Sequence, residues 1–137
     1  ELLRKRGINI VDALTNFNNM LKICDVAVGH NVSFDKRMVI VEGVRNKIMM
    51  NVHDTFCTMK NSVELCKIER TWPSGDTYFK YPTLSELHYK LFEKIPKNTH
   101  NALIDILICM RCFVKMEFKK DISRINRTIR LMMRDAC

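Results

Sequence analysis

The chain has 137 residues, of which 47% are hydrophobic and 28% are charged. This balance suits one globular domain and excludes a disordered or fibrous chain. No apolar run approaches the roughly 20 residues that a membrane helix needs. The opening stretch ELLRKRGINI lacks the apolar core of a secretory signal. We therefore expect an intracellular protein, cytoplasmic or nuclear, or one acting in a host cell if its source is viral.

Basic residues are in excess: 23 Lys and Arg face 15 Asp and Glu, and the net charge is +8 at pH 7. Nucleic acid is the commonest anionic partner of a soluble basic domain. The six cysteines suit a reducing compartment as free thiols. Cys109 and Cys112 form a CxxC pair without a second pair to complete a zinc site, so we expect them to be packing residues one helical turn apart.

In chain order, the first expected helix follows Asn9, a residue type that caps helices, and has Asp12 in its first turn. Residues 25–29 then have the short apolar character of a buried parallel strand. A second helix is predicted over 33–44, with Asp35 in its first turn. Residues 48–54 are predicted as a second strand and residues 55–68 as a broken helix. Two strand-then-helix units imply parallel strands and an α/β fold.

Residues 70–82, RTWPSGDTYFKYP, contain a turn signal and are predicted to form a loop or a small hairpin. Aromatic residues here are interleaved with Arg70 and Lys80, a combination that can stack on unpaired bases. These aromatic residues are Trp72, Tyr78, Phe79 and Tyr81. The alternative, which we favour on general grounds, is that they fold back onto the domain.

A capping box formed by Thr83 and Glu86 predicts the start of the next helix, which should end before Pro96. A long apolar helix follows. Five residues rotate by about 140° around a helix, so His100 and Asp105 would lie on different faces if both were helical. We therefore expect His100 just before this helix, with Thr99 or His100 at its cap and Asp105 in its second turn.

Residues 119–137 are expected to form a basic amphipathic helix that packs on the domain or extends from it. Isoleucines recur on one side and arginines occupy the rest. A solvated basic face is the ordinary interpretation, and a face that contacts phosphates is the alternative.

Two motifs indicate a family. GHNxxFD, at residues 29–35, ends the first predicted strand, and HNAxxD, at residues 100–105, opens the long helix. In this order and spacing they resemble the second and third motifs of the DEDDh 3′-5′ exonucleases, a family that includes the proofreading exonuclease of bacterial replicative polymerases. The stretches ELLRKRGI, HDTF and YPTLSELHYKLF are also similar to the corresponding parts of that family.

The resemblance implies a ribonuclease H-like fold that removes nucleotides from a 3′ end. In such enzymes four carboxylates hold two Mg²⁺ or Mn²⁺ ions about 4 Å apart, one activating water and the other stabilising the leaving 3′ oxygen. It implies that Asp35 and Asp105 are metal ligands. It also implies that His100 is the general base, a role that suits an imidazole with a pKa of about 6.5.

The same resemblance places three further residues against the terminal nucleotide: His30, Asn31 and Phe34. The alternative for His30 and Asn31 is that they brace the turn between strand and helix. The expected partner is the single-stranded 3′ end of DNA or RNA. A polymerase or another replication or repair protein is a further candidate partner, and a membrane is not expected.

One family motif, Asp-x-Glu, does not occur in these 137 residues. We expect it, with the first three strands of the sheet, upstream of Glu1, so that residues 1–118 form the C-terminal two-thirds of an exonuclease domain and retain two parallel strands. Two carboxylates compensate half of the four positive charges of two ions. The isolated chain is therefore expected to be nearly inactive.

Two alternatives to catalysis stay open at this point. First-turn acids such as Asp35 and Asp105 can simply complement the helix dipole, although this leaves His100 and the paired residues Asn31 and Asn101 unexplained. The competing function is a non-catalytic nucleic-acid-binding module with the same fold.

Overall fold

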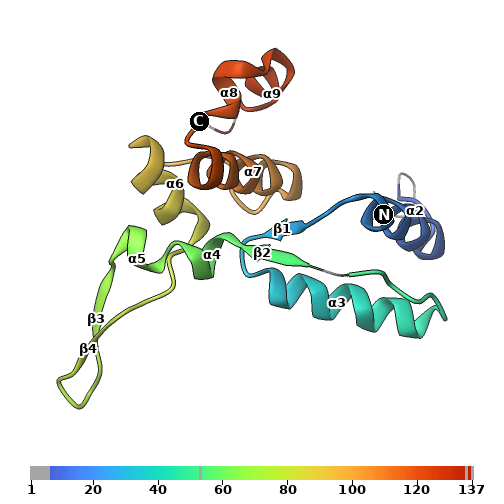
Figure 1. Cartoon of the computed structure of the whole chain (residues 1–137), viewed down its shortest axis with the longest axis horizontal. Coiled ribbons are helices and arrows are strands. Elements are labelled where there is room, and N and C mark those ends of the chain that lie inside the picture. Colours follow the sequence, from blue (N-terminus) through green and yellow to red (C-terminus); the bar gives the residue numbers. More distant parts are fainter. Residues whose placement is uncertain (1–6, 53, 135, 137) are drawn as a thin grey trace. The chain divides into compact units, whose positions relative to one another are not determined.

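A computed structural model of the chain describes all residues except 1–6, 53, 135 and 137. Most of the stretch ELLRKRGI and the histidine of HDTF lie outside the described residues. The elements, in chain order, are α2 (Ile10–Ile23), β1 (Ala27–Gly29), α3 (Val32–Arg45), β2 (Thr55–Cys57), α4 (Thr58–Asn61), α5 (Val63–Cys66), β3 (Glu69–Thr71), β4 (Thr77–Phe79), α6 (Leu84–Phe92), α7 (Ala102–Phe118), α8 (Ile122–Ile125) and α9 (Arg127–Met132) (Figure 1).

The described elements mix helices with two small sheets. Strands β1 and β2 pair in a parallel sheet, and β3 and β4 form an antiparallel hairpin. The α/β fold class predicted from the sequence is therefore confirmed. Among the described residues, no helix combines the length and the hydropathy that spanning a membrane requires.

Contacts divide the chain into two compact units. Unit 1 consists of the described residues within Glu1–Ala27 and Val32–Phe56, and it contains α2 and α3. Unit 2 consists of the described residues within Val28–Asn31 and Cys57–Cys137, and it contains the hairpin and α4 to α9.

In unit 1, α2 begins as predicted, because the side chain of Asn9 accepts a hydrogen bond from the Val11 backbone N–H at 2.8 Å. Helix α3 spans Val32–Arg45 and so confirms the helix predicted over 33–44. Its Gly43 is packed closely, since a Cβ atom there would lie 2.7 Å from the carbonyl oxygen of Ile48. The chain leaving α3 is thus held against the helix.

The strand predicted over 48–54 is wrong in its position, because the strand that forms is β2 at Thr55–Cys57. The side chain of buried Asn18 forms hydrogen bonds with backbone groups that would otherwise pair with a neighbouring strand. Its amide donates to the Met49 carbonyl at 2.9 Å, and its oxygen accepts from the Asn51 N–H at 2.7 Å. Residues 48–52 consequently have no regular structure.

The segment predicted as a broken helix over 55–68 begins instead with strand β2, and its helical part consists of two short helices, α4 and α5. Lys67 ends α5 in the left-handed conformation, with φ of 47°. Helix α6 has the predicted capping box, in which the Thr83 hydroxyl and the Glu86 carboxylate each accept a backbone N–H of the other residue. It ends at Phe92, before Pro96, as predicted.

The core of unit 2 lies between α6 and α7. Its buried members are Leu87, Ile104, Leu107, Ile108, Cys112, Met133 and Ala136. Cys109 and Cys112 are both buried on α7, which confirms the prediction that they are packing residues. The five cysteines that the structure describes are free thiols.

The tail does not form the single helix predicted over 119–137. Asn126 has an extended backbone, with φ of −123° and ψ of 114°, and its side chain accepts from the Ile129 N–H at 3.0 Å. It therefore ends α8 and caps α9. Met133 and Ala136 are buried in the core of unit 2, while Arg124, Arg127 and Arg130 are exposed. The choice between a solvated face and a phosphate-binding face stays open.

Segment 70–82 forms a hairpin, one of the two predicted outcomes. The prediction that its aromatic residues fold back onto the domain is wrong, because all residues of β3 and β4 are exposed. Trp72 is 53% exposed and Tyr81 57%. The Trp72 and Tyr78 rings stack on each other instead, with centroids 4.4 Å apart.

Candidate functional site

Asp35 lies in the first turn of α3, as predicted, and belongs to unit 1. Partial burial raises the pKa of its carboxyl above the ordinary value of 3.8, and a hydrogen bond from its own backbone N–H opposes that rise. Phe34 precedes it and is 55% exposed. Its predicted contact with a terminal nucleotide stays a prediction.

Asn31 and His100 share an unusual backbone conformation. Both lie in the left-handed region, with φ of 71° at Asn31 and 74° at His100. Asn and His adopt this conformation more readily than most non-glycine residues. Each residue stands immediately before a helix or its cap, so the left-handed turn sets the direction in which α3 or α7 leaves the preceding loop.

His30 is held on both sides of its ring within unit 2. Its Nε2 lies 3.0 Å from the Pro82 carbonyl oxygen, which can only accept, so Nε2 carries a proton and donates it. Its Nδ1 lies 3.0 Å from the Thr58 hydroxyl, and in the neutral ring this nitrogen accepts. Burial lowers the pKa of His30, which favours that neutral form.

These contacts favour the alternative in which His30 braces the turn after β1. The Thr58 hydroxyl is also 3.3 Å from the Gly29 carbonyl oxygen and 3.6 Å from the Cys109 sulfur. Thr58 and Pro82 thus fix the imidazole from two distant parts of the chain. A direct contact of His30 with a nucleotide stays a prediction, and so does that of Asn31, whose side chain is exposed.

The HNAxxD motif begins α7 in unit 2. The cap is Asn101, not Thr99 or His100 as predicted, because the Asn101 side chain accepts from the backbone N–H groups of Leu103 and Ile104 at 3.1 and 3.3 Å. Asp105 lies in the first turn of the helix rather than the second, and it is half-buried. His100 precedes the helix, as predicted, and is exposed.

Asn101 therefore does have a capping role, which corrects the argument that capping leaves both paired asparagines unexplained. Thr58, the partner of His30, is the residue of this region that sequence reasoning missed. It lies 28 residues from His30. No local pattern marks such a long-range partner.

The predicted metal ligands fall in different units, Asp35 in unit 1 and Asp105 with His100 in unit 2. Their convergence on one pocket stays a prediction. Carboxylate oxygens are the hard ligands that Mg²⁺ and Mn²⁺ prefer, so the donor type fits such ions. Among the residues that the structure describes, no three His, Cys, Asp or Glu side chains gather closely enough to hold a metal ion. The described donors therefore fit in kind but not in number.

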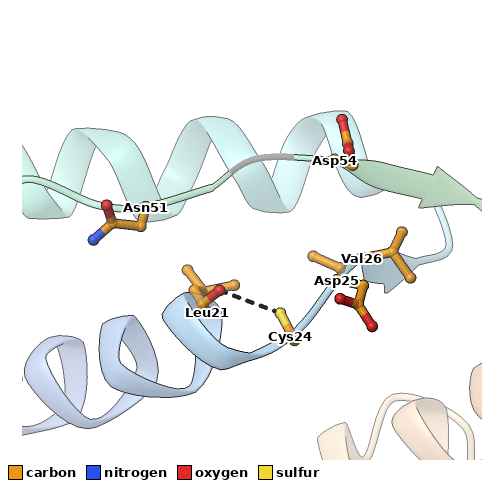
Figure 2. Close-up of a pocket in the computed structure, with 7 residues that line it drawn as sticks. Leu21, Cys24, Asp25, Val26, Asn51 and Asp54 are labelled. Atoms are coloured by element: carbon orange, nitrogen blue, oxygen red, sulfur yellow. Dashed lines mark hydrogen bonds between the residues drawn. The ribbon is translucent and has the colours of Figure 1, made fainter.

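Unit 1 has a small surface hollow that none of these candidates lines. Its wall consists of Leu21, Cys24, Asp25, Val26, Ala27, Asn51 and Asp54. The Cys24 thiol donates to the Leu21 carbonyl oxygen at 3.5 Å, and the carboxylates of Asp25 and Asp54 point away from one another (Figure 2). Two acids in this arrangement do not form a paired catalytic site.

A second polar cluster of unit 2 is structural. His88 Nδ1 donates to the Lys94 carbonyl oxygen at 2.7 Å, which leaves Nε2 to accept from Arg111 at 3.0 Å. Burial lowers the pKa of His88. Arg111 in turn binds Asp121, and its hydrogen bonds hold the pKa of that carboxyl far below the ordinary value of 3.8. Helices α6 and α7 are joined to the start of α8 by these contacts.

Comparison with known proteins bears on both motif segments. The family model described as exonuclease matches residues 5–113 of the chain. No curated protein and no solved structure matches the chain. The matched span includes GHNxxFD and HNAxxD and ends within α7, and the mixed α/β architecture is consistent with a ribonuclease H-like exonuclease domain.

Proposed function

Because the chain belongs to the exonuclease family, we propose that it carries part of a DEDDh-type 3′-5′ exonuclease site, which hydrolyses phosphodiester bonds at the 3′ end of a nucleic acid. The observation that carries this proposal is the family match over residues 5–113. That span holds two acids, Asp35 and Asp105, each in the first turn of a helix, and a histidine beside the second.

In this proposal Asp35 and Asp105 hold divalent ions, Mg²⁺ or Mn²⁺. When bound, such ions supply electrostatic stabilisation of the charge that develops in phosphodiester cleavage. The two helices fix the backbone positions from which the carboxylates extend, since both acids lie in a first turn. The Asn101 cap holds the start of α7, the element that carries Asp105.

His100 is the proposed general base. Its imidazole is exposed and lies just before the helix, so it can take a proton from water at the 3′ end of a substrate. The left-handed backbone at His100 is a strained conformation, which costs roughly 1–3 kcal/mol and is found preferentially at functional sites.

The charge balance sets a requirement on the rest of the site. Two carboxylates supply two negative charges against the four positive charges of two ions, and no Asp-x-Glu occurs in these residues. The proposal therefore requires two further acids from outside these 137 residues. Hydrolysis by the 137-residue chain alone is expected to be weak.

The test uses a single-stranded oligonucleotide labelled at its 5′ end, with and without Mn²⁺. It is given to the 137-residue chain and to the longest natural product that contains it. The longer product should shorten the labelled strand one nucleotide at a time, only with the metal, while the 137-residue chain should do little. Strong cleavage by the 137-residue chain would contradict the requirement for two further acids.

Variants of the longer product assign the roles. Asp35→Asn and Asp105→Asn should each lower the rate at least about a hundredfold, because each removes a metal ligand. Asp12→Asn is the matched control, since Asp12 is also a first-turn acid but belongs to α2 and has no proposed role. Equal rates in all three variants would overturn the assignment, as would release of nucleotides from the 5′ end.

The second candidate function is a nucleic-acid-binding module without catalysis. The net charge of +8 and the absence of Asp-x-Glu favour it. A binder would retain tight, salt-sensitive association after Asp35→Asn and Asp105→Asn. It would also show no hydrolysis in the longer product.

A further inference from the structure

The β3–β4 hairpin carries an aromatic pair that the rest of the described chain leaves exposed. It extends from unit 2 away from α6 and α7 (Figure 1). The Trp72 and Tyr78 rings stack with an interplanar angle of 27°, and they remain 53% and 37% exposed. Two adjacent exposed aromatic rings form a contiguous apolar surface, which is typical of an interaction site.

The register of the hairpin sorts its side chains onto two faces. Arg70 lies opposite Tyr78, and Thr71 lies opposite Thr77. Two further hydrogen bonds extend this register: the Trp72 N–H donates to the Asp76 carbonyl at 2.8 Å, and the Lys80 N–H donates to the Ile68 carbonyl at 2.9 Å. Because side chains alternate along a strand, one face carries Arg70, Trp72, Asp76, Tyr78 and Lys80, and we call it the Trp72 face.

The Trp72 face combines aromatic rings with positive charge, and the opposite face does not. Lys80 forms an ion pair with the Glu86 carboxylate at 2.7 Å, which partly compensates the charge of Lys80. Arg70 is exposed, so its guanidinium is accessible to a ligand. Asp76 is the acid of the Trp72 face, at its turn end, and its carboxylate accepts a hydrogen bond from the Ser74 hydroxyl at 2.8 Å. The opposite face carries Glu69, Thr71, Thr77 and Phe79.

We propose that the Trp72 face binds single-stranded nucleic acid, with an unpaired base stacked on Trp72 and an adjacent phosphate bound by Arg70. This inference rests on the proposed function, which supplies nucleic acid as the substrate class. Each base has a π face, so stacking on an aromatic side chain does not depend on sequence. The stack with Tyr78 holds the Trp72 ring in place before the base arrives, which reduces the entropy lost on binding.

The charge of the chain favours this occupant over a protein partner. A net charge of +8 draws a polyanion toward the surface, and Arg70 adds a guanidinium that pairs well with phosphate. Duplex DNA is a poor fit, because its bases are stacked on each other and leave no free π face. The Trp72 face should therefore distinguish single strands from duplexes.

Trp72 is the single tryptophan of the chain, so its fluorescence reports this face directly. The experiment titrates the full chain with a single-stranded thymidine 12-mer in EDTA, where metal-dependent hydrolysis cannot occur. The probes for comparison are an abasic 12-mer and a duplex of the same length. Emission should be quenched by the base-containing single strand and much less by the other two.

Variants locate the contact. Tyr78→Ala should raise Kd roughly tenfold, because it removes the ring that holds Trp72, and Tyr78→Phe should restore binding. Phe79→Ala is the matched control: Phe79 is as exposed as Tyr78, at 37%, but lies on the opposite face, so its loss should leave Kd unchanged. Arg70→Ala should weaken binding and flatten its dependence on salt.

Three results would overturn the proposal. Quenching by the abasic strand equal to that by the thymidine strand would exclude base stacking. Unchanged emission while the anisotropy of a labelled strand reports saturation would place the nucleic acid elsewhere. A concentration-dependent shift of Trp72 emission that accompanies self-association, without any effect of oligonucleotide, would assign the face to a second copy of the chain.

The outcome is separable from that of the proposed exonuclease activity. Asp35→Asn and Asp105→Asn should leave the fluorescence titration unchanged, because neither residue belongs to the hairpin. Quenching in EDTA together with no 3′ hydrolysis by the longer product in Mn²⁺ would contradict the proposed activity alone. Hydrolysis without quenching would contradict the stacking proposal alone.

Discussion

Arg111 and Asp121 form a bidentate ion pair in the interior of unit 2. The Arg111 Nε and Nη2 atoms donate to the two Asp121 carboxylate oxygens at 2.9 and 2.7 Å, and the side chains are only 9% and 11% exposed. The guanidinium also donates to His88 Nε2 at 3.0 Å and lies 3.8 Å from the centroid of the Phe92 ring. Its charge is therefore compensated from several sides.

Removing the acid should destabilise unit 2 strongly. In Asp121→Asn the Arg111 charge stays buried but loses its counter-ion, which typically costs about 3–5 kcal/mol. Urea denaturation followed by circular dichroism measures this loss. The matched control is Arg124→Ala: Arg124 lies 3.8 Å from the same carboxylate but is 86% exposed, so its loss should cost less than about 1 kcal/mol. Similar losses in the two variants would show that Arg111 finds another partner.

The same pair makes stability depend on pH in a defined direction. The pKa of Asp121 is far below 3.8 in the folded chain, so the folded state holds fewer protons than the unfolded state at acidic pH. This contribution is complete above about pH 4 and is lost as the pH falls below that value. Urea midpoints measured from pH 5 to pH 2.5 should fall more steeply for the natural chain than for Asp121→Asn. Parallel curves would contradict the assignment.

Thr58 should be needed to hold His30. Thr58→Val keeps the shape of the side chain but leaves His30 Nδ1 without its hydroxyl partner, which should cost about 1–3 kcal/mol. Thr55→Val is the control, because Thr55 is a threonine three residues earlier in the chain but is exposed. Thermal melting gives the stability of both variants. A loss of stability no larger for Thr58→Val than for Thr55→Val would exclude the bracing role.

Local hydrogen bonds of this fold could be predicted from the sequence, and long-range ones could not. The Asn9 cap and the Thr83 capping box were predicted because their hydrogen bonds close within three residues. The pairing of Asn18 with Met49 spans 31 residues, and it displaced the predicted strand at 48–54. Such pairing depends on how elements pack, which no local pattern encodes.

The candidate site was likewise predicted only in part. The motifs correctly placed Asp35 in the first turn of a helix and His100 just before one. They did not identify the cap of α7, because Thr99, His100 and Asn101 are adjacent and each is chemically able to cap. The backbone decides, since the left-handed φ of 74° at His100 leaves the extended cap conformation to Asn101.

The Asn101 cap predicts a purely structural phenotype. Asn101→Ala removes the acceptor of two backbone N–H groups and should lower stability by about 1 kcal/mol. Asn101→Ser should restore it, because serine caps helices about as well as asparagine. Chemical denaturation of the two variants measures the difference. If serine fails to restore stability while the structure is retained, the asparagine amide has a role beyond capping.

His100→Gly separates strain from chemistry. Glycine adopts the left-handed φ of 74° without a Cβ penalty, and this gain offsets the greater flexibility that glycine gives the unfolded chain. Stability should therefore stay within about 1 kcal/mol of the natural chain, or rise. Nucleotide release by the longer product should nevertheless fall at least about a hundredfold, because the proposed base is gone. Added imidazole should recover part of that rate if His100 transfers protons. A variant that is equally stable and equally active would show that the left-handed backbone at residue 100, and not the imidazole, is what the site requires.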